Sequence, residues 1–144
     1  MEIELERDRF ASREWCRGRA RLRGGAEARA SRVTATLRGF ETWRQPFSSR
    51  PPVRRIRFEK SVEMAAALLS AGGEVPFELR VPGPEELEAL PEPPAFLRRL
   101  VLWLDPEAIG PLRWEVEVRL HRGFRRDAVA TRPIEVALAG AVAT

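Results

Sequence analysis

The fold class is decided by the stretch Glu74-Val75-Pro76-Phe77-Glu78-Leu79-Arg80-Val81-Pro82. Its apolar side chains, Val75, Phe77, Leu79 and Val81, occupy every second position, and Glu, Pro and Arg occupy the positions between them. Successive side chains of an extended strand point to opposite faces, so the apolar set lies on one face. Gly72-Gly73 before the stretch and Pro82-Gly83-Pro84 after it are turn signals. The pattern therefore predicts a β-strand with one face in a core.

The same alternation recurs along most of the chain and predicts further strands. Within residues 15–23, small and apolar residues alternate with four arginines, and Gly18 indicates a bulge or a close approach of two backbones. Seven or eight short strands separated by turn signals are typical of a β-sandwich of two sheets. The other predicted strands lie at residues 2–6, 29–40 with a continuation to 43, 55–58, 112–120 and 134–138.

Some segments depart from the alternation. Residues 60–71 contain Met-Ala-Ala-Ala-Leu-Leu, which has helical propensity, but they lie between two strands and we expect a strand there. Residues 84–90 begin with Pro-Glu-Glu, which is a helix-start signal. Residues 95–104 fit a helix or a strand, and their apolar spacing slightly favours a helix. We therefore expect an all-β chain with a short helical insertion around residues 84–104.

The composition indicates one globular domain, spanning residues 1–144 and long enough to bury a core. The chain is 44% hydrophobic and 32% charged, which argues against disorder. Its apolar runs are shorter than the roughly 18 residues of a membrane-spanning helix. The acidic, alternating start differs from a secretion signal, so we expect a cytoplasmic location. The tryptophans are expected in the core or against the sheets: Trp15, Trp43 beside a Pro-rich loop, Trp103 and Trp114.

Catalytic residues are sparse, and we expect no enzymatic activity, cofactor or metal. Cys16 is the only cysteine, which excludes an internal disulfide and a cysteine-rich zinc site. His121 is the only histidine and lies at a strand end. The acidic residues mostly occupy alternating outward positions, whereas acid–base catalysis needs a tuned titrating pair. Cys16 itself lies on an inward face, where a small core residue is expected.

Several segments, in this order, resemble the N-terminal domain of the arrestin family. The alternating first strand is followed by Phe10 and by a strand that bears Gly18. The stretch from Val75 to Pro82 is similar to a family strand in which Pro-Phe and alternating Leu residues precede a proline. The resemblance continues in residues 32–37, in residues 114–120 and in residues 134–136.

The resemblance implies an immunoglobulin-like sandwich that serves as an adaptor or scaffold without catalysis. The superfamily includes arrestins, a retromer subunit and bacterial sporulation-control proteins. This chain has room for one sandwich where most relatives have two, and residues 84–111 form an extra segment. Receptor-binding arrestins contact phosphates through two basic residues just before the phenylalanine. Here Arg7 and Arg9 are separated by Asp8, so Arg7 alone corresponds to that pair.

Arginines on predicted strand faces are candidate contacts for an anionic partner. The chain has 25 basic and 21 acidic residues, a net charge of +4, which permits such a partner without demanding one. Alternation places four arginines about 6.8 Å apart on one strand face. This stripe fits phosphates of nucleic acid or an anionic membrane surface. A ladder of ion pairs with glutamates of neighbouring strands is the favoured interpretation. The stripe consists of Arg17, Arg19, Arg21 and Arg23.

Two further groups of arginines have a functional and a structural interpretation. Arg122, Arg125 and Arg126 surround Phe124 in one turn, where an exposed ring would stack on a base. A ring buried under its own hairpin is the commoner outcome. The second group, Arg54, Arg55 and Arg57, is interpreted as the solvated face of a strand.

Three hypotheses about function follow. The leading one is an arrestin-like adaptor or scaffold domain that binds a protein by sheet-edge pairing or through the apolar surface of residues 84–111. The second is an anionic-ligand binder, with nucleic acid or anionic lipid as the ligand. The third is a homodimer, in which a second copy replaces the second sandwich of the relatives.

Overall fold

The computed structural model describes residues 1–21, 32–44, 51–64, 74–87, 99, 103, 110–121 and 128–138. This part of the chain contains eight β-strands and one 3₁₀ turn, η1 (Pro84–Glu86). The strands are β1 (Glu2–Leu5), β2 (Arg9–Ala11), β3 (Trp15–Arg21), β4 (Arg32–Trp43), β5 (Val53–Met64), β6 (Glu74–Arg80), β7 (Arg113–His121) and β8 (Ala128–Ala137).

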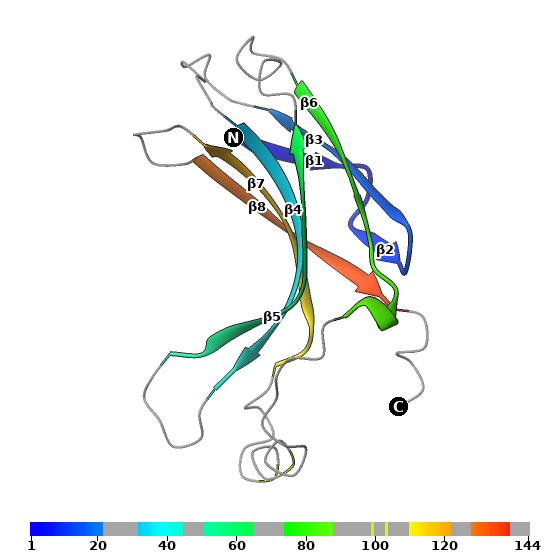
Figure 1. Ribbon diagram of the computed structural model, residues 1–144, viewed down its shortest axis with the longest axis vertical. Helices are drawn as coiled ribbons and strands as arrows, with labels where there is room; N and C mark the ends of the chain where they lie inside the picture. Colours follow the sequence, from blue (N-terminus) through cyan, green and yellow to red (C-terminus); the bar gives the residue numbers. More distant parts are fainter. Residues whose placement is uncertain are drawn as a thin grey trace.

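The strands form two sheets that lie face to face (Figure 1). One sheet has three strands in the order β1-β3-β6, and the other has five in the order β2-β8-β7-β4-β5. β2 pairs in parallel with the C-terminal end of β8, which reaches across to it in Figure 1. Arg132 of β8 links the sheets, because its guanidinium donates to Ile3 O at 3.2 Å and to Asp8 Oδ1 at 2.8 Å. The predicted two-sheet, all-β architecture is confirmed.

The core lies between the sheets and is built by the alternation that the sequence shows. In β6 the inward side chains are at most 4% exposed, while Pro76 and Glu78 between them are exposed. β3 alternates in the same way, whereas in β4 and β7 some residues between the inward positions are buried too, among them Thr36 and Glu115. The inward residues of the two sheets meet in the core. Fully buried members include Cys16, Ala20, Val33, Ala35, Leu37, Val81, Val116, Val118 and Leu120.

Gly18 marks a close approach between backbones and side chains in the three-stranded sheet. It lies between Leu5 of β1 and Phe77 of β6 in the strand register. A Cβ atom on Gly18 would lie 2.6 Å from Glu4 O and 2.7 Å from Phe77 Cζ. Real Cβ atoms are not found at such distances, so only glycine fits here without a shift of its neighbours. The close approach predicted from the sequence is confirmed.

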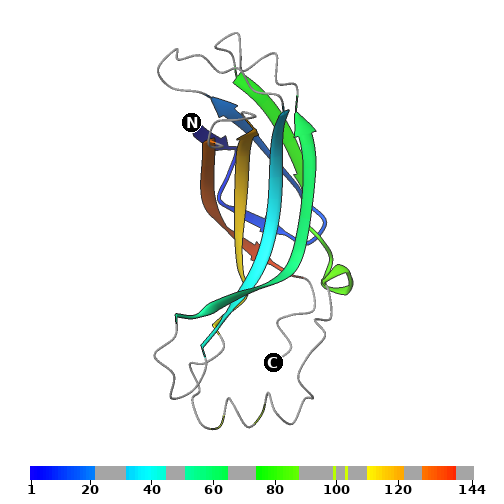
Figure 2. The same cartoon turned by 60° about the vertical axis from the view of Figure 1, so that its left-hand side comes forward.

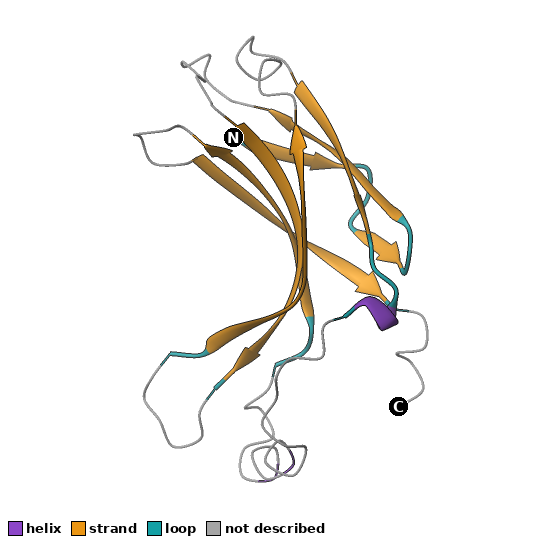
Figure 3. Ribbon diagram, viewed as in Figure 1, coloured by secondary structure: helices purple, strands orange, loops and turns teal. Residues whose placement is uncertain are grey.

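The irregular segments agree with expectation as far as they are described (Figure 3). β5 continues to Met64, so the strand expected in residues 60–71 is confirmed up to that point, and residues 65–71 lie outside the described residues. The predicted insertion begins with η1, where the Gly83 N–H donates to Glu86 Oε2 at 2.6 Å. Arg99 and Trp103 have helical backbones, and the remainder of residues 88–109 lies outside the described part.

The expectation that the tryptophans pack in the core or against the sheets is wrong for two of them. Trp15 is 48% exposed, because strand alternation turns it outward when its neighbour Cys16 points into the core. Trp103 is 79% exposed and belongs to neither sheet. Trp114 is 4% exposed and lies in the core as expected.

β4 and β5 form a ribbon that extends beyond the sandwich at the lower end of Figures 1 and 2. Each strand has 12 residues, and the register shifts between Gly39 and Phe40. Gly39 is opposite Phe58 and Phe40 is opposite Ile56, so Arg57 is the extra residue of a β-bulge. On the side of β4 that faces β7, strand pairing ends at Phe40. Beyond that point the Gly110 N–H donates to Thr42 O at 2.8 Å.

Candidate functional site

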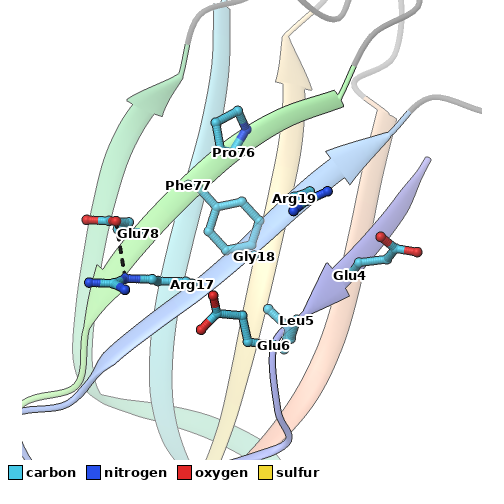
Figure 4. Close-up of a pocket in the computed structure, with 9 residues that line it drawn as sticks. All are labelled: Glu4, Leu5, Glu6, Arg17, Gly18, Arg19, Pro76, Phe77 and Glu78. Carbon is cyan, nitrogen blue, oxygen red and sulfur yellow. Dashed lines mark ion pairs between the residues drawn. The ribbon is translucent and has the colours of Figure 1, made fainter.

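The described arginines of the stripe lie on the outer face of β3, the central strand of the three-stranded sheet. Arg17 pairs with Glu78 at 3.2 Å, an ion pair drawn as the dashed line in Figure 4. Arg19 pairs with Glu74 at 3.2 Å. Arg21 pairs with Glu74 at 2.6 Å and with Glu4 at 3.5 Å. These arginines form the cross-strand ladder that the sequence favours, because glutamates on both neighbouring strands face them.

The outer face of this sheet is not basic. Among the described residues it carries five glutamates and four arginines, namely Glu2, Glu4, Glu6, Glu74, Glu78, Arg17, Arg19, Arg21 and Arg80. An open groove of about 420 Å³ crosses the three strands over Gly18 and Pro76 (Figure 4). Its rim alternates in charge, and a polyanion approaching it meets glutamates beside each arginine. Electrostatic attraction of phosphates to this face is therefore weak.

The remaining candidates for anion binding are not part of this face as described. Arg7 lies before β2, where it pairs with Glu14 and its guanidinium carbon lies 5.2 Å from the centre of the Phe10 ring. The structure thus gives Arg7 an acidic partner and an aromatic partner. Arg23, Arg122, Arg125 and Arg126 lie outside the described residues.

The densest group of ion pairs lies on the outer face of the five-stranded sheet and was missed by sequence reasoning. Arg38 of β4 donates to three carboxylates on the flanking strands, at 2.7 Å to Glu59, 3.1 Å to Glu115 and 3.0 Å to Glu117. Its side chain is only 16% exposed. Glu115 and Glu117 are 9% and 13% exposed, although strand alternation places them on the outward face. Charged side chains of three strands therefore cover one another.

The Arg38 cluster holds the Glu117 carboxylate in the charged form. Burial alone would raise the pKa of Glu117, but hydrogen bonds from Arg38 and Arg119 outweigh it and lower the pKa below its usual value. With its pKa lowered, the Glu117 carboxyl is unsuited to act as a general acid near neutral pH. The ion pairs of the cluster link three neighbouring strands of the sheet.

The solvated face that the sequence predicts for the arginines of β5 is confirmed for Arg54, whose side chain is 54% exposed, and is wrong for Arg57. Arg54 pairs with Glu115 at 2.9 Å, and its guanidinium carbon lies 3.9 Å from the centre of the Phe40 ring. Arg57, placed by the bulge, pairs with Glu41 at 2.7 Å and has a side chain that is 19% exposed. The prediction failed because it considered one strand, whereas the partners belong to β4 and β7.

The outer edge of β5 is the longest open sheet edge in the described part of the chain. β5 is the last strand of the five-stranded sheet, so its backbone N–H and C=O groups have strand partners only on the side that faces β4. Val53 at its start is 58% exposed. Open edges present backbone N–H and C=O groups that can pair with another strand. No sequence signal marks β5 as an edge, because strand order depends on contacts between distant segments.

The titratable residues weighed for catalysis occupy structural positions. Cys16 is fully buried, and burial raises the pKa of its thiol to about 11. A thiol with that pKa is almost entirely protonated at neutral pH and is a poor nucleophile. His121 Nε2 lies 3.3 Å from the Thr34 hydroxyl. Across the described ranges, no group of three or more His, Cys, Asp or Glu side chains is arranged to hold a metal ion.

Comparisons with known proteins find a similarity to a solved structure. No family model and no curated protein matches the chain. It is similar to the crystal structure of Spo0M, a sporulation control protein from Bacillus subtilis, with a TM-score of 0.49 and 15% sequence identity. The similarity covers 94% of this chain and 48% of that one, so this chain spans about half the length of Spo0M. In the part of the chain that is described, no helix is long and apolar enough to cross a membrane.

Proposed function

We propose that this chain is a non-enzymatic adaptor or scaffold domain that binds a protein partner by pairing an extended segment of it with the edge of β5. The observation that carries the proposal is the open outer edge of this 12-residue strand. In such binding, backbone hydrogen bonds supply much of the affinity and alternate side chains supply specificity.

The other sheet edges are less suited to pairing with a partner. β2 has three residues and β1 has four, so each offers few backbone groups. β6 has seven residues, but its edge lies next to β5 at one side of the sandwich, and the two strands are in contact. The N-terminal half of β5 belongs instead to the ribbon that extends past the sandwich (Figure 2). A partner strand can reach this half without displacing another element of the described structure.

The charges near this edge favour an acidic partner segment. Residues 53–58 contain three arginines and no acidic residue. Two of the arginines are held on their own sheet, since Arg54 pairs with Glu115 and Arg57 with Glu41. Arg55 lies over the Trp43 ring at 4.4 Å, and its charge adds to the positive potential at the edge. Acidic side chains on an added strand would lie beside these guanidinium groups.

The second function predicted from the sequence, binding of nucleic acid or anionic lipid through the stripe, has less support. The described stripe arginines pair with glutamates, and their face carries more acidic than basic residues. The third hypothesis, a homodimer through β5, would bring three arginines of one copy close to three of the other. Like charges opposite one another destabilise strand pairing.

Site-specific cross-linking tests the proposal. A photoreactive phenylalanine analogue is placed at Val53, beside the open edge, and in a matched control at Val129 of β8, whose side chain is 45% exposed. After irradiation in native extract, the Val53 variant should recover a specific protein that the Val129 variant does not. Recovery of no protein, or of the same abundant proteins with both variants, would contradict the proposal.

A further inference from the structure

Lys60 is the only lysine of the chain and starts on the core-facing side of β5. In the strand register it is opposite Leu37 of β4, which is fully buried. Opposite residues of an antiparallel pair point to the same face of the sheet, so the Lys60 side chain begins on the inner face. Lys60 is nevertheless exposed, because β5 is an edge strand and a long side chain can carry its ammonium past the edge into water.

The neighbours of Lys60 on this face are apolar. Phe58, Val62 and Met64 are partly buried and pack against the core. They are opposite core-facing positions of β4, as Lys60 is. Lys60 therefore carries the single charge in a row of alternate positions from residue 58 to residue 64. Without that charge, the inner side of this segment would be apolar from end to end.

The outer edge of residues 58–64 has no strand partner among the described residues. β6 of the other sheet is in contact with β5, but the two strands do not pair. Within the same described part of the chain, the Lys60 ammonium has no ion pair and no hydrogen bond. A strand added along this edge would cover the ammonium and leave it without water or a counter-charge, which is costly.

A second copy of the chain carries a segment that matches this edge. Two copies of residues 58–64 pair antiparallel when Phe58 of one copy lies opposite Met64 of the other. In the same register, Lys60 of one copy lies opposite Val62 of the other. The inner side of such a pair is apolar on both strands except at the two lysines. Pairing would therefore bury two unpaired charges together with the apolar row.

The other charges of β5 do not prevent this pairing. The three arginines at residues 54–57 lie beyond the ends of the paired segments, so those of the two copies stay apart. Glu59 and Glu63 would face each other on the outer side, but each already has an arginine of β4 as a partner. Glu59 pairs with Arg38 at 2.7 Å, and Glu63 pairs with Arg32 at 3.9 Å. Lys60 is then the charge that decides whether the segment can pair.

We propose that the Lys60 ammonium keeps residues 58–64 of β5 from pairing with the same segment of a second copy of the chain. A self-complementary surface is thus present in the fold, and one charge closes it. The proposal does not depend on the protein partner proposed for residues 53–58, which form the other end of the strand.

Lys60→Val tests the proposal, because it removes the charge and completes the apolar row. Sedimentation is measured at about 0.15 M sodium chloride, which screens the repulsion between the arginines. The variant should dimerise at a concentration at least about a hundredfold below the first at which wild type associates. Lys60→Arg is the matched control, since it keeps the charge on a long side chain, and it should behave as wild type. Arg9→Val exchanges an 82% exposed cation of β2 for the same valine and should also stay monomeric.

Acetylation of amines makes the same test on a chain that has already folded. Because Lys60 is the only lysine, the reagent removes its charge and otherwise modifies only the α-amino group. Acetylated wild type should associate, whereas acetylated Lys60→Arg, whose α-amino group reacts equally, should not. Amide exchange in residues 58–64 should be slower in the dimer, because the edge N–H groups gain partners.

Three results would overturn the proposal. The first is a Lys60→Val variant that keeps the wild-type fold and stays monomeric at every concentration at which wild type does. The second is equal association of acetylated wild type and acetylated Lys60→Arg. The third is a Lys60→Val dimer in which amide exchange of residues 58–64 is unchanged.

Discussion

Gly18 lies against the ring of Phe77 so closely that a Cβ atom on Gly18 would be 2.7 Å from Phe77 Cζ. The two residues are opposite each other in β3 and β6, and Phe77 is 4% exposed in the core. The absence of a side chain in one strand thus makes room for the ring of the next. This relationship fixes the packing of the sheet that carries the arginine stripe.

Gly18→Ala should therefore destabilise the domain by about 1–3 kcal/mol, because the added methyl group forces neighbours to shift. The free energy of unfolding is measured by chemical denaturation. Phe77→Leu in the same chain should restore only part of the loss, since the methyl group would still lie 2.6 Å from Glu4 O. Gly83→Ala is the control, because its Cβ would meet the end of the Glu85 side chain, which can move. Equal costs at Gly18 and Gly83 would contradict the close packing.

Arg38→Gln should cost about 3 kcal/mol of stability, because it removes the shared partner of two largely buried carboxylates. Arg54 still pairs with Glu115 in this variant, which limits the loss. Arg9→Gln breaks an ion pair of the same 2.7 Å length whose side chains are 82% and 70% exposed. It should cost less than about 1 kcal/mol. Similar losses in the two variants would show that burial does not govern the strength of these pairs.

The stabilisation by the Arg38 cluster should depend on pH. The pKa of Glu117 is lower in the folded protein than its usual value, so the folded state favours the ionised carboxylate. This contribution is fully present above the unfolded pKa of about 4.3 and is lost as the pH falls through the folded pKa. The difference in stability between wild type and Arg38→Gln should therefore be largest near neutral pH and should narrow in acid. A stability difference between wild type and Arg38→Gln that stays constant from pH 7 to pH 3 would contradict stabilisation through the ionised Glu117 carboxylate.

Cys16 should be unreactive in the folded protein. Its side chain is fully buried and burial raises the pKa of the thiol to about 11, so little thiolate exists at pH 8. A thiol reagent should label the native protein only as fast as the protein opens, and should label it rapidly in denaturant. Rapid labelling of the native protein at pH 8 would show that the thiol is accessible.

Self-association is expected to be weak, because pairing β5 with its own copy brings arginines together. Sedimentation at increasing protein concentration should show a monomer at low salt, where repulsion is strongest. A stable dimer at micromolar concentration would indicate that β5 pairs with a second copy of the chain and would contradict the proposed external partner.

The sequence predicts individual strands well because alternation is a local signal. Val75, Phe77 and Leu79 point inward as their spacing indicates. The same rule fails for Glu115, which is on the outward face yet has a side chain that is only 9% exposed, because arginines of β4 and β5 cover it. Which strands are neighbours depends on contacts between distant segments, and no local pattern contains that information.

The candidate sites were harder to predict for the same reason. The stripe on β3 was visible because its arginines are consecutive outward positions of one strand. The Arg38 cluster combines three strands that are far apart in the sequence, and its single residues have no distinguishing pattern. A search for outward Arg and Glu on each strand would have found the residues but not their proximity.

The most direct test of the adaptor proposal is amide hydrogen exchange of this domain with and without the partner captured at Val53. Pairing with the open edge should slow exchange in residues 53–58, because outward N–H groups there gain strand partners. Exchange in β1 and β3 of the other sheet should remain unchanged. Slowed exchange confined to β1 and β3, with residues 53–58 unaffected, would contradict binding at β5.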